Sequence, residues 1–130
     1  MMDSTYISFY LYANRIHVFV DTLRGIGSPG RICFLLNRDG TRLLVAPHGK
    51  KDFVSHSVPE NVYAGSDSME VSSKKLCRLI AGLHNWDVAY SYRVPGFIET
   101  KKHVAVFDLS RAEIISRDDY RNEHTADDDD

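Results

Sequence analysis

Long apolar runs, clustered metal ligands and glycine-rich phosphate loops are all missing from this sequence of 130 residues. No run approaches the roughly 18 apolar residues that a membrane-spanning helix needs, and residues 1–5 lack the basic and then apolar order of a signal peptide. No His-x-x-x-His or Cys-x-x-Cys spacing occurs, and residues 24–30 lack both the lysine and the long helix of a phosphate loop. We therefore expect a cytoplasmic protein that is not an enzyme and holds no metal or cofactor.

Cysteine is scarce, with only Cys33 and Cys77, and both lie inside apolar segments. Free thiols of a protein core in a reducing compartment are favoured, and a disulfide is the alternative. The run Ser55-His56-Ser57 places hydroxyls beside an imidazole, but adjacent residues of an extended chain rarely point at one another. A polar loop is therefore the favoured interpretation of this run, and a nucleophile beside its base is the alternative.

Charge is unevenly spread, although the formal net charge of the chain is only −2. Residues 112–130 hold eight of the 18 acidic residues and two of the 16 basic ones, which leaves 14 bases and 10 acids in residues 1–111. A basic body with an acidic tail is typical of proteins that bind polyanions, since the tail competes with phosphate for the basic face. A tail that only aids solubility is the alternative. Residues 122–130 are predicted to be disordered.

The pattern of apolar residues predicts the same order of elements twice: a strand, then a helix, then a β-hairpin. The first copy occupies residues 16–46 and the second residues 69–109. A repeated unit suggests two copies packed about a pseudo-twofold axis. We therefore predict an α+β, strand-rich fold in which residues 1–121 form one domain. That domain would contain two related β-α-β-β units, about 5–47 and 69–115, joined by a linker over 48–68.

Local patterns support the strands of this plan. Residues 5–12 alternate apolar with polar or aromatic side chains, and this period is typical of a half-buried strand with Ile7, Phe9 and Leu11 inside. Asp39-Gly40 between two apolar runs predicts a tight hairpin turn. The linker is predicted to hold a short strand near Phe53-Val54 or Val62-Tyr63. Pro95-Gly96 is predicted to bend or interrupt the strand that contains it.

The second helix has the clearest pattern in the chain and is predicted over residues 72–83. Ser72 or Ser73 can cap its start. Its apolar positions fall three and four residues apart, so one buried stripe is expected, made of Leu76, Leu79, Ile80 and Leu83. Trp86 follows the helix and is expected to fill the core where the chain turns into the next strand.

Residues 16–47 carry three motifs in order: Leu23-Arg24-Gly25-Ile26-Gly27 in the short helix, Pro29-Gly30-Arg31-Ile32 before a strand, and Asp39-Gly40-Thr41 before a strand ending at Pro47. In this order the segment resembles the swapped-hairpin repeat of AbrB-type transition-state regulators. Two such units in one chain is the plan of MraZ proteins. The resemblance implies an interlocked barrel in which two units exchange their hairpins.

The resemblance also implies a transcriptional regulator that binds double-stranded DNA as a homodimer. Arg24 is the first candidate for a DNA contact, because it matches the position of the arginine in the short helix of the family. Arg15, just before the first strand, is a second candidate. Arginine suits both base edges and phosphates, whereas lysine mostly supplies charge for phosphate. The remaining candidate contacts lie on the first hairpin and at the start of the second helix: Arg31, Arg38, Arg42, Lys74, Lys75 and Arg78.

Two alternatives to DNA contact remain at this stage. Each basic residue taken singly is also explained as an ordinary solvated surface charge. The whole chain is also explained as a protein-interaction or antitoxin-like module that keeps the fold and binds no nucleic acid.

Overall fold

The computed structural model describes residues 3–52 and 54–115. Its strands, in chain order, are β1 (Asp3–Tyr10), β2 (Arg15–Phe19), β3 (Arg31–Leu36), β4 (Arg42–Pro47), β5 (Ser55–Ser57), β6 (Ser68–Ser72), β7 (Ser91–Glu99), β8 (Val104–Asp108) and β9 (Glu113–Ile115). Its helices are η1 (Leu11–Ala13), α1 (Val20–Gly25), α2 (Glu60–Tyr63), α3 (Lys74–His84) and η2 (Leu109–Arg111). The predicted disordered tail, residues 122–130, lies outside the described residues.

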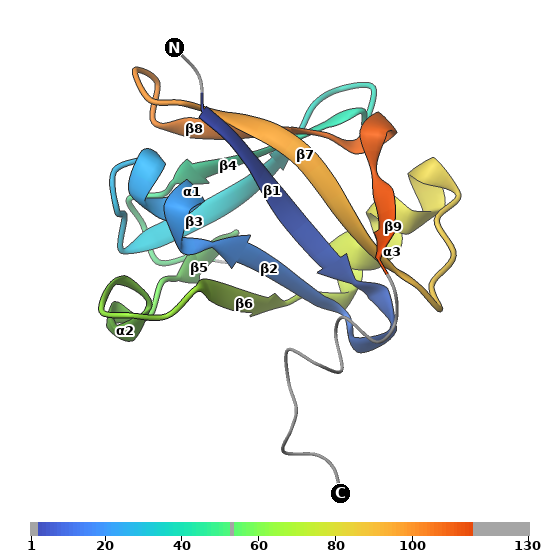
Figure 1. Cartoon of the computed structure of the whole chain (residues 1–130), viewed down its shortest axis with the longest axis horizontal. Helices are drawn as coiled ribbons and strands as arrows, with labels where there is room; N and C mark the ends of the chain where they lie inside the picture. The colour runs from blue at the N-terminus through green and yellow to red at the C-terminus, as the bar shows by residue number, and fades with distance from the viewer. Residues whose placement is uncertain (1–2, 53, 116–130) are drawn as a thin grey trace, which may run out of the picture.

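The strands form a nearly closed barrel, with α1 and α3 on opposite sides of it (Figure 1). Within the described residues the strand order is β5-β3-β4-β8-β7-β1-β2-β6, and β9 pairs with β7 beside this path. Every strand pair in this part of the chain is antiparallel. The strand-rich fold class is therefore confirmed.

Each of the two long hairpins pairs on one side with a strand that is distant in the sequence and on the other with further strands. The hairpin of β3 and β4 pairs with β5 on one side and β8 on the other. The hairpin of β7 and β8 pairs with β1 and β4, and β9 joins β7 near its start. Strands β2 and β6 also pair with one another. Distant segments therefore close the barrel, and local hairpins alone would not.

The core lies inside the barrel, and Ile7 and Phe9 of β1 are fully buried in it as predicted, as is Leu11 in the turn that follows. The prediction of a half-buried strand is wrong for the second half of β1, because Ser8 and Tyr10 on its other face are fully buried too. Trp86 also packs against this core, as predicted. Its ring stacks on Tyr92 with centroids 4.5 Å apart and meets the edge of Phe9 at 5.5 Å.

The predicted buried stripe of α3 is only partly correct. Ile80 is fully buried as expected, but Leu79 is 49% exposed and Leu83 is 52% exposed. The face that packs on the barrel is centred instead on Cys77, Ile80 and Ala81. Successive residues turn by about 100° around a helix, so this face is rotated away from Leu79. The spacing of the apolar residues therefore predicted the helix correctly, but it predicted the wrong helix face as the one that packs on the barrel.

The predicted interruption at Pro95-Gly96 is wrong, because β7 runs through both residues without a break. Pro95 pairs with Tyr6 of β1, and the ladder to β8 begins only at Gly96. The missing amide hydrogen of the proline therefore costs no hydrogen bond to β8. Gly96 is required by close packing, since a Cβ atom there would lie 2.3 Å from the carbonyl oxygen of Val106.

The segment predicted as a linker contains regular structure of its own. Strand β5 forms at Ser55–Ser57 and pairs with β3, immediately after the predicted position at Phe53-Val54. The other suggested strand, at Val62-Tyr63, is wrong, because these residues belong to the short helix α2. Val62 is buried in the core, and this contact holds the helix on the barrel.

The turns follow their sequence signals more closely than the linker does. Gly40 has a φ of 73°, the left-handed conformation that the Asp39-Gly40 pair predicts. The Asp39 carboxylate accepts hydrogen bonds from the backbone amide and the hydroxyl of Thr41. These bonds lower the pKa of Asp39. The turn between β3 and β4 is therefore fixed by its own side chains.

Candidate nucleic-acid interface

The pairing of β2 with β6 brings the start of β2 beside the first turn of α3. Arg15 lies opposite Ser72, and the amide of Ser73 donates to the carbonyl oxygen of Asn14 over 3.0 Å. Ser73 is also the N-cap of the helix, as predicted, because its hydroxyl accepts from the amide of Leu76 over 3.2 Å. Two segments nearly 60 residues apart therefore meet at one edge of the barrel, called the α3 end below and defined by residues 14–15 and 72–78.

Four of the eight predicted DNA-contact residues gather at the α3 end: Arg15, Lys74, Lys75 and Arg78. The three on the helix are exposed and have no hydrogen-bond or ion-pair partner among the described residues. The first turn of α3 carries no acidic residue. Because a helix N-terminus is the positive end of its dipole, cations in this turn are intrinsically unfavourable. The placement becomes favourable when an anion binds there.

Arg15 is held in place by acidic and aromatic neighbours on the same outer face of the sheet. Its guanidinium forms an ion pair with Glu70 of β6. His17 Nε2 donates to the other oxygen of Glu70 over 3.0 Å, and the His17 ring meets Tyr10 edge-on at 4.7 Å. The Arg15 side chain stays 42% exposed. One carboxylate thus orients a guanidinium that solvent can still reach.

The opposite end of the same strand pair, called the α1 end, is defined by residues 20–24 and 67–68. The amide of Val20 donates to the carbonyl oxygen of Asp67 over 2.8 Å, so α1 starts where β6 begins. Asp21 and Asp67 line a cavity of about 570 Å³ there, together with Arg93. Arg24 projects from α1 and donates to the carbonyl oxygen of Tyr63 over 3.0 Å. This residue, the best-matched candidate by resemblance, therefore ties α1 to α2.

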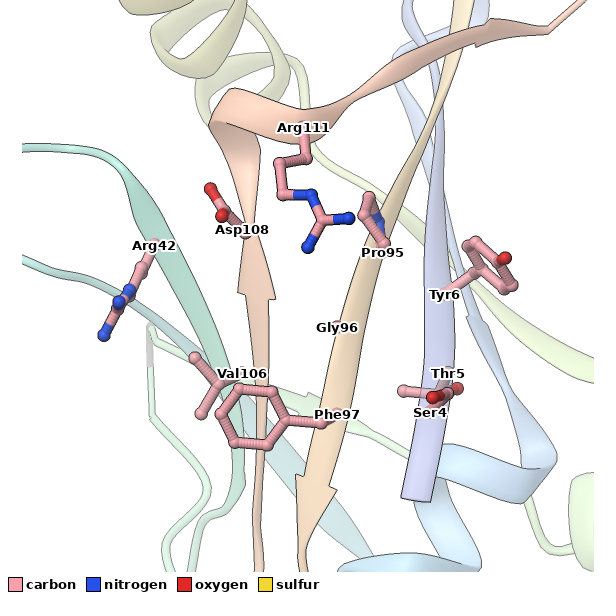
Figure 2. A pocket seen from close by; sticks show the side chains of 10 residues that line it. All are labelled: Ser4, Thr5, Tyr6, Arg42, Pro95, Gly96, Phe97, Val106, Asp108 and Arg111. Atoms are coloured by element: carbon pink, nitrogen blue, oxygen red, sulfur yellow. The ribbon is translucent and has the colours of Figure 1, made fainter. Parts of the chain in front are cut away.

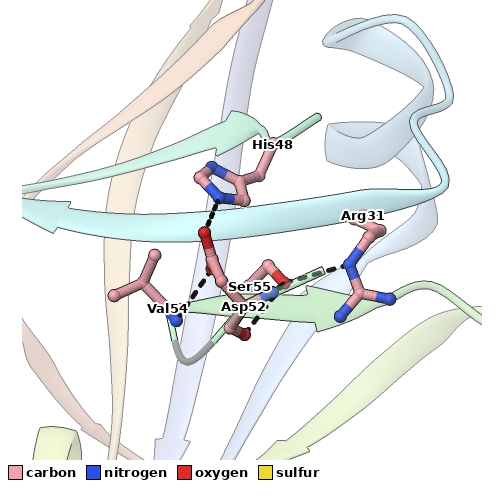
Figure 3. Close-up of polar contacts among 5 residues, drawn as sticks. All are labelled: Arg31, His48, Asp52, Val54 and Ser55. Atoms are coloured by element: carbon pink, nitrogen blue, oxygen red, sulfur yellow. Dashed lines mark hydrogen bonds and ion pairs between the residues drawn. The ribbon is translucent and has the colours of Figure 1, made fainter. Parts of the chain in front are cut away.

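Arg31 lies elsewhere on the barrel, where β3 meets β5 (Figure 3). Its Nε donates to Ser55 Oγ over 3.0 Å, and the amide of Asp52 donates to the same oxygen over 3.1 Å. Ser55 Oγ in turn donates to the carbonyl oxygen of Asp52 over 3.2 Å. Arg31 therefore holds β5 against β3. This structural role accounts for an arginine at position 31 without any contact to nucleic acid.

The same cluster contains a serine, a histidine and an aspartate, but the histidine does not contact the serine as a catalytic triad requires. His48 Nε2 donates to Asp52 Oδ2 over 2.9 Å, and this hydrogen bond lowers the pKa of the Asp52 carboxyl. Ser55 directs its proton to a backbone carbonyl and has no bond to His48. His56 packs edge-on against Phe34, with a pKa lowered by burial and by the charge of Arg31. A nucleophile activated by a base is therefore not formed here.

Arg42 lines a separate cavity of about 360 Å³ on the outer face of the barrel, over β7 and β8 (Figure 2). Arg111 of η2 reaches into the same cavity. No sequence pattern pointed to Arg111, because its place depends on the turn that follows β8. Arg42 pairs across the strands with Asp108 and lies apart from the α3 end. Arg38 is exposed in the turn between β3 and β4. The other four predicted contacts, Arg24, Arg31, Arg38 and Arg42, therefore lie outside the α3 end.

The two cysteines are free and buried, in agreement with the prediction of core thiols. Burial raises the pKa of Cys77 to about 11 and also raises that of Cys33, which the charge of Asp52 raises further. Both side chains therefore remain protonated thiols at neutral pH.

Among the described residues, no cluster of three or more histidine, cysteine or acidic side chains is placed to hold a metal ion. The helices in this part of the chain are all too short or too polar to cross a membrane. Comparison of the chain with protein-family models, with curated proteins and with solved structures found no match.

Proposed function

We propose that this protein binds double-stranded DNA through the α3 end. The observation that carries the proposal is the hydrogen bond between Ser73 and Asn14, together with the pairing of Arg15 with Ser72. These contacts bring three cations of α3, which have no partner among the described residues, to the same edge of the barrel as Arg15. Phosphates of a duplex are the partner whose charge such a surface favours.

The helix itself adds to this attraction. The first backbone amides of α3 point out of its N-terminus. Among the described contacts at this end, the Ser73 hydroxyl accepts a hydrogen bond from the amide of Leu76 alone. A phosphate near Lys74 and Lys75 would meet both the positive end of the helix dipole and two ammonium groups. Binding at this surface would therefore depend on backbone contacts more than on base contacts.

The proposal includes the AbrB-like plan of two related units, about 5–47 and 69–115. The order of strand, helix and hairpin recurs as β2-α1-β3-β4 and β6-α3-β7-β8. Like strands pair, since β2 meets β6 and β4 meets β8, and each hairpin pairs outside itself with the other part of the chain. These pairings are what two units that exchange hairpins would make, and they support a role in transcriptional control.

The test is binding of a fluorescently labelled random duplex, followed by anisotropy at about 50 mM and about 200 mM salt. The variant Lys74→Gln/Lys75→Gln should bind less tightly than the unchanged protein. Its plot of log affinity against log salt should be shallower by about 0.9 for each lost phosphate contact. Lys50→Gln/Lys51→Gln removes the same charge from an exposed loop away from α3 and is the matched control.

Equal affinities and slopes for the two double variants would contradict the proposed surface. Absence of duplex binding by the unchanged protein at about 50 mM salt would contradict the function itself.

A second candidate function is a protein-interaction module, and one observation favours it. Leu79 and Leu83 are about half exposed on α3, one turn apart. An apolar pair of this kind suits a contact with another protein or with a second copy, such as the homodimer that the resemblance implies. Leu79→Ser/Leu83→Ser should then change the molar mass measured by light scattering. An unchanged molar mass would exclude a homodimer that forms through Leu79 and Leu83.

A further inference from the structure

The cavity that contains Arg42 and Arg111 has a chemistry different from that of the α3 end. It lies on the outer face of the sheet, where two rows of cross-strand partners run side by side. One row pairs Arg42 with Asp108, and the next pairs Val106 with Phe97 and Phe97 with Ser4. Directly paired residues share one face of a sheet, so these side chains all face the same space. Figure 2 shows this arrangement.

Two arginines line the cavity on either side of Asp108, and in Figure 2 Arg111 extends toward Pro95 while Arg42 extends away from the other lining residues. Neither Arg42 nor Arg111 has a side-chain hydrogen bond or ion pair with another described residue. Asp108 directs one oxygen to Ser110, accepting from its amide at 3.1 Å and from its hydroxyl at 2.6 Å. That oxygen therefore stabilises the turn, and the Arg111 guanidinium is the group in the cavity that can receive an anion.

The apolar part of the cavity is formed by Phe97, Val106 and Pro95, all half-buried. The Phe97 ring and Val106 lie side by side across β7 and β8 (Figure 2). A flat apolar surface of this kind next to guanidinium groups suits a ring on one side and an anion on the other. The volume of about 360 Å³ is near the lower limit for small-molecule sites, so a single ring system fits better than a polymer.

We propose that this cavity binds a small anion that carries a flat apolar ring, with the anion on Arg111 and the ring against Phe97. Aromatic carboxylates and nucleoside monophosphates share this chemistry. Ser4 and Asp108 would take the remaining polar groups of the ligand. The site is independent of the proposed DNA surface, because none of its anchoring side chains belongs to α3 or to the start of β2.

The test is isothermal titration calorimetry of the full chain with two probes, indole-3-acetate and adenosine monophosphate. Indole-3-acetamide has the ring of the first probe without its charge, and inorganic phosphate has the charge of the second without a ring. At least one of the two ring-bearing anions should bind, and more tightly than both of these controls. Binding of only one probe would identify the carboxylate or the phosphate as the anion.

Arg111→Gln should weaken binding of the anionic probe by at least about tenfold, the loss expected for a charge-assisted hydrogen-bonded pair. Phe97→Leu keeps the surface apolar and removes the flat ring, so it should weaken both the anionic probe and the neutral indole. Arg38→Gln removes the same charge from the exposed β3–β4 turn and should leave binding unchanged. Amide NMR spectra of each variant would establish that the fold is kept.

Three results would overturn the proposal. The first is no binding of either ring-bearing anion at about 1 mM, a concentration that detects even weak sites. The second is binding by Arg111→Gln that equals that of the unchanged protein. The third is inorganic phosphate binding as tightly as adenosine monophosphate, since this would leave no role for the ring.

Discussion

The two ends of the β2–β6 strand pair have the same architecture and opposite charge. At each end a strand leads directly into a helix, which is α1 after β2 and α3 after β6. The α3 end presents Lys74, Lys75 and Arg78 without acids in the first helical turn, whereas the α1 end presents Asp21 and Asp67. A duplex would therefore be attracted to one end of the pair and repelled from the other.

This difference explains why the best sequence match is not the best structural candidate. Arg24 occupies the place that the AbrB resemblance assigns to DNA contact, but its guanidinium donates to the carbonyl oxygen of Tyr63, and α1 carries Asp21 in its first turn. Lys74 and Lys75 lie outside residues 16–47, the segment that carries the resemblance. In a symmetric dimer of single units both ends would be alike, whereas in the proposed chain of two units the ends can diverge.

The largest expected effect concerns how both helices are anchored. Leu23 of α1 and Ile80 of α3 are fully buried, so Leu23→Ala and Ile80→Ala should each lower the free energy of unfolding by about 2–5 kcal/mol. Leu79→Ala, at a half-exposed position, should cost less than about 1 kcal/mol. Urea unfolding followed by Trp86 fluorescence measures all three. A cost at Leu79 equal to that at Ile80 would mean that the packed face of α3 is assigned wrongly.

A second effect is expected on DNA affinity when the charge difference between the ends is removed. Asp21→Lys/Asp67→Lys replaces two exposed acids with bases and would make the α1 end resemble the α3 end. Affinity for a random duplex at about 50 mM salt should rise by about tenfold, since each added cation can release counterions from a phosphate. Anisotropy measures the change. No gain in affinity would mean that charge at the strand-pair ends does not control binding.

A smaller effect is expected from the acidic tail, whose residues lie outside the described part of the chain. Deletion of residues 118–130 should tighten duplex binding by a few-fold at about 50 mM salt, because a tethered polyanion competes with DNA for the α3 end. The gain should shrink at about 200 mM salt, where the screening length is shorter. A tail that only aids solubility would leave both affinities unchanged.

The smallest effect concerns the thiols, one in each half of the chain. Because burial raises the pKa of Cys77 to about 11, its reaction with a thiol reagent should be slow at pH 8. The rate should keep increasing as the pH approaches 11, since the thiolate fraction grows. Mass spectrometry of the labelled native protein measures this rate. Fast labelling of Cys77 at pH 8 would show that the covered face of α3 opens readily.

The sequence predicted the local elements well, because their signals are local. The alternation in β1, the Asp39-Gly40 turn and the Ser73 cap each depend on contacts within a few residues. The helix α2 and the exposure of Leu79 depend on which surface the barrel presents to them, and no short pattern contains that information. The candidate site was half predicted. Its four cations were named from the sequence, but the start of β2 lies beside the start of α3 only because β2 and β6 pair across the chain.

Amide NMR of the full chain titrated with a random duplex tests the proposed DNA-binding surface most directly. Shifts should concentrate at residues 14–15 and 72–78, with little change at Asp21 and Asp67. The Lys74→Gln/Lys75→Gln variant should lose these shifts, and the Lys50→Gln/Lys51→Gln control should retain them. Shifts at the α1 end in place of the α3 end would contradict the proposed surface. A titration without shifts at low salt would contradict DNA binding itself.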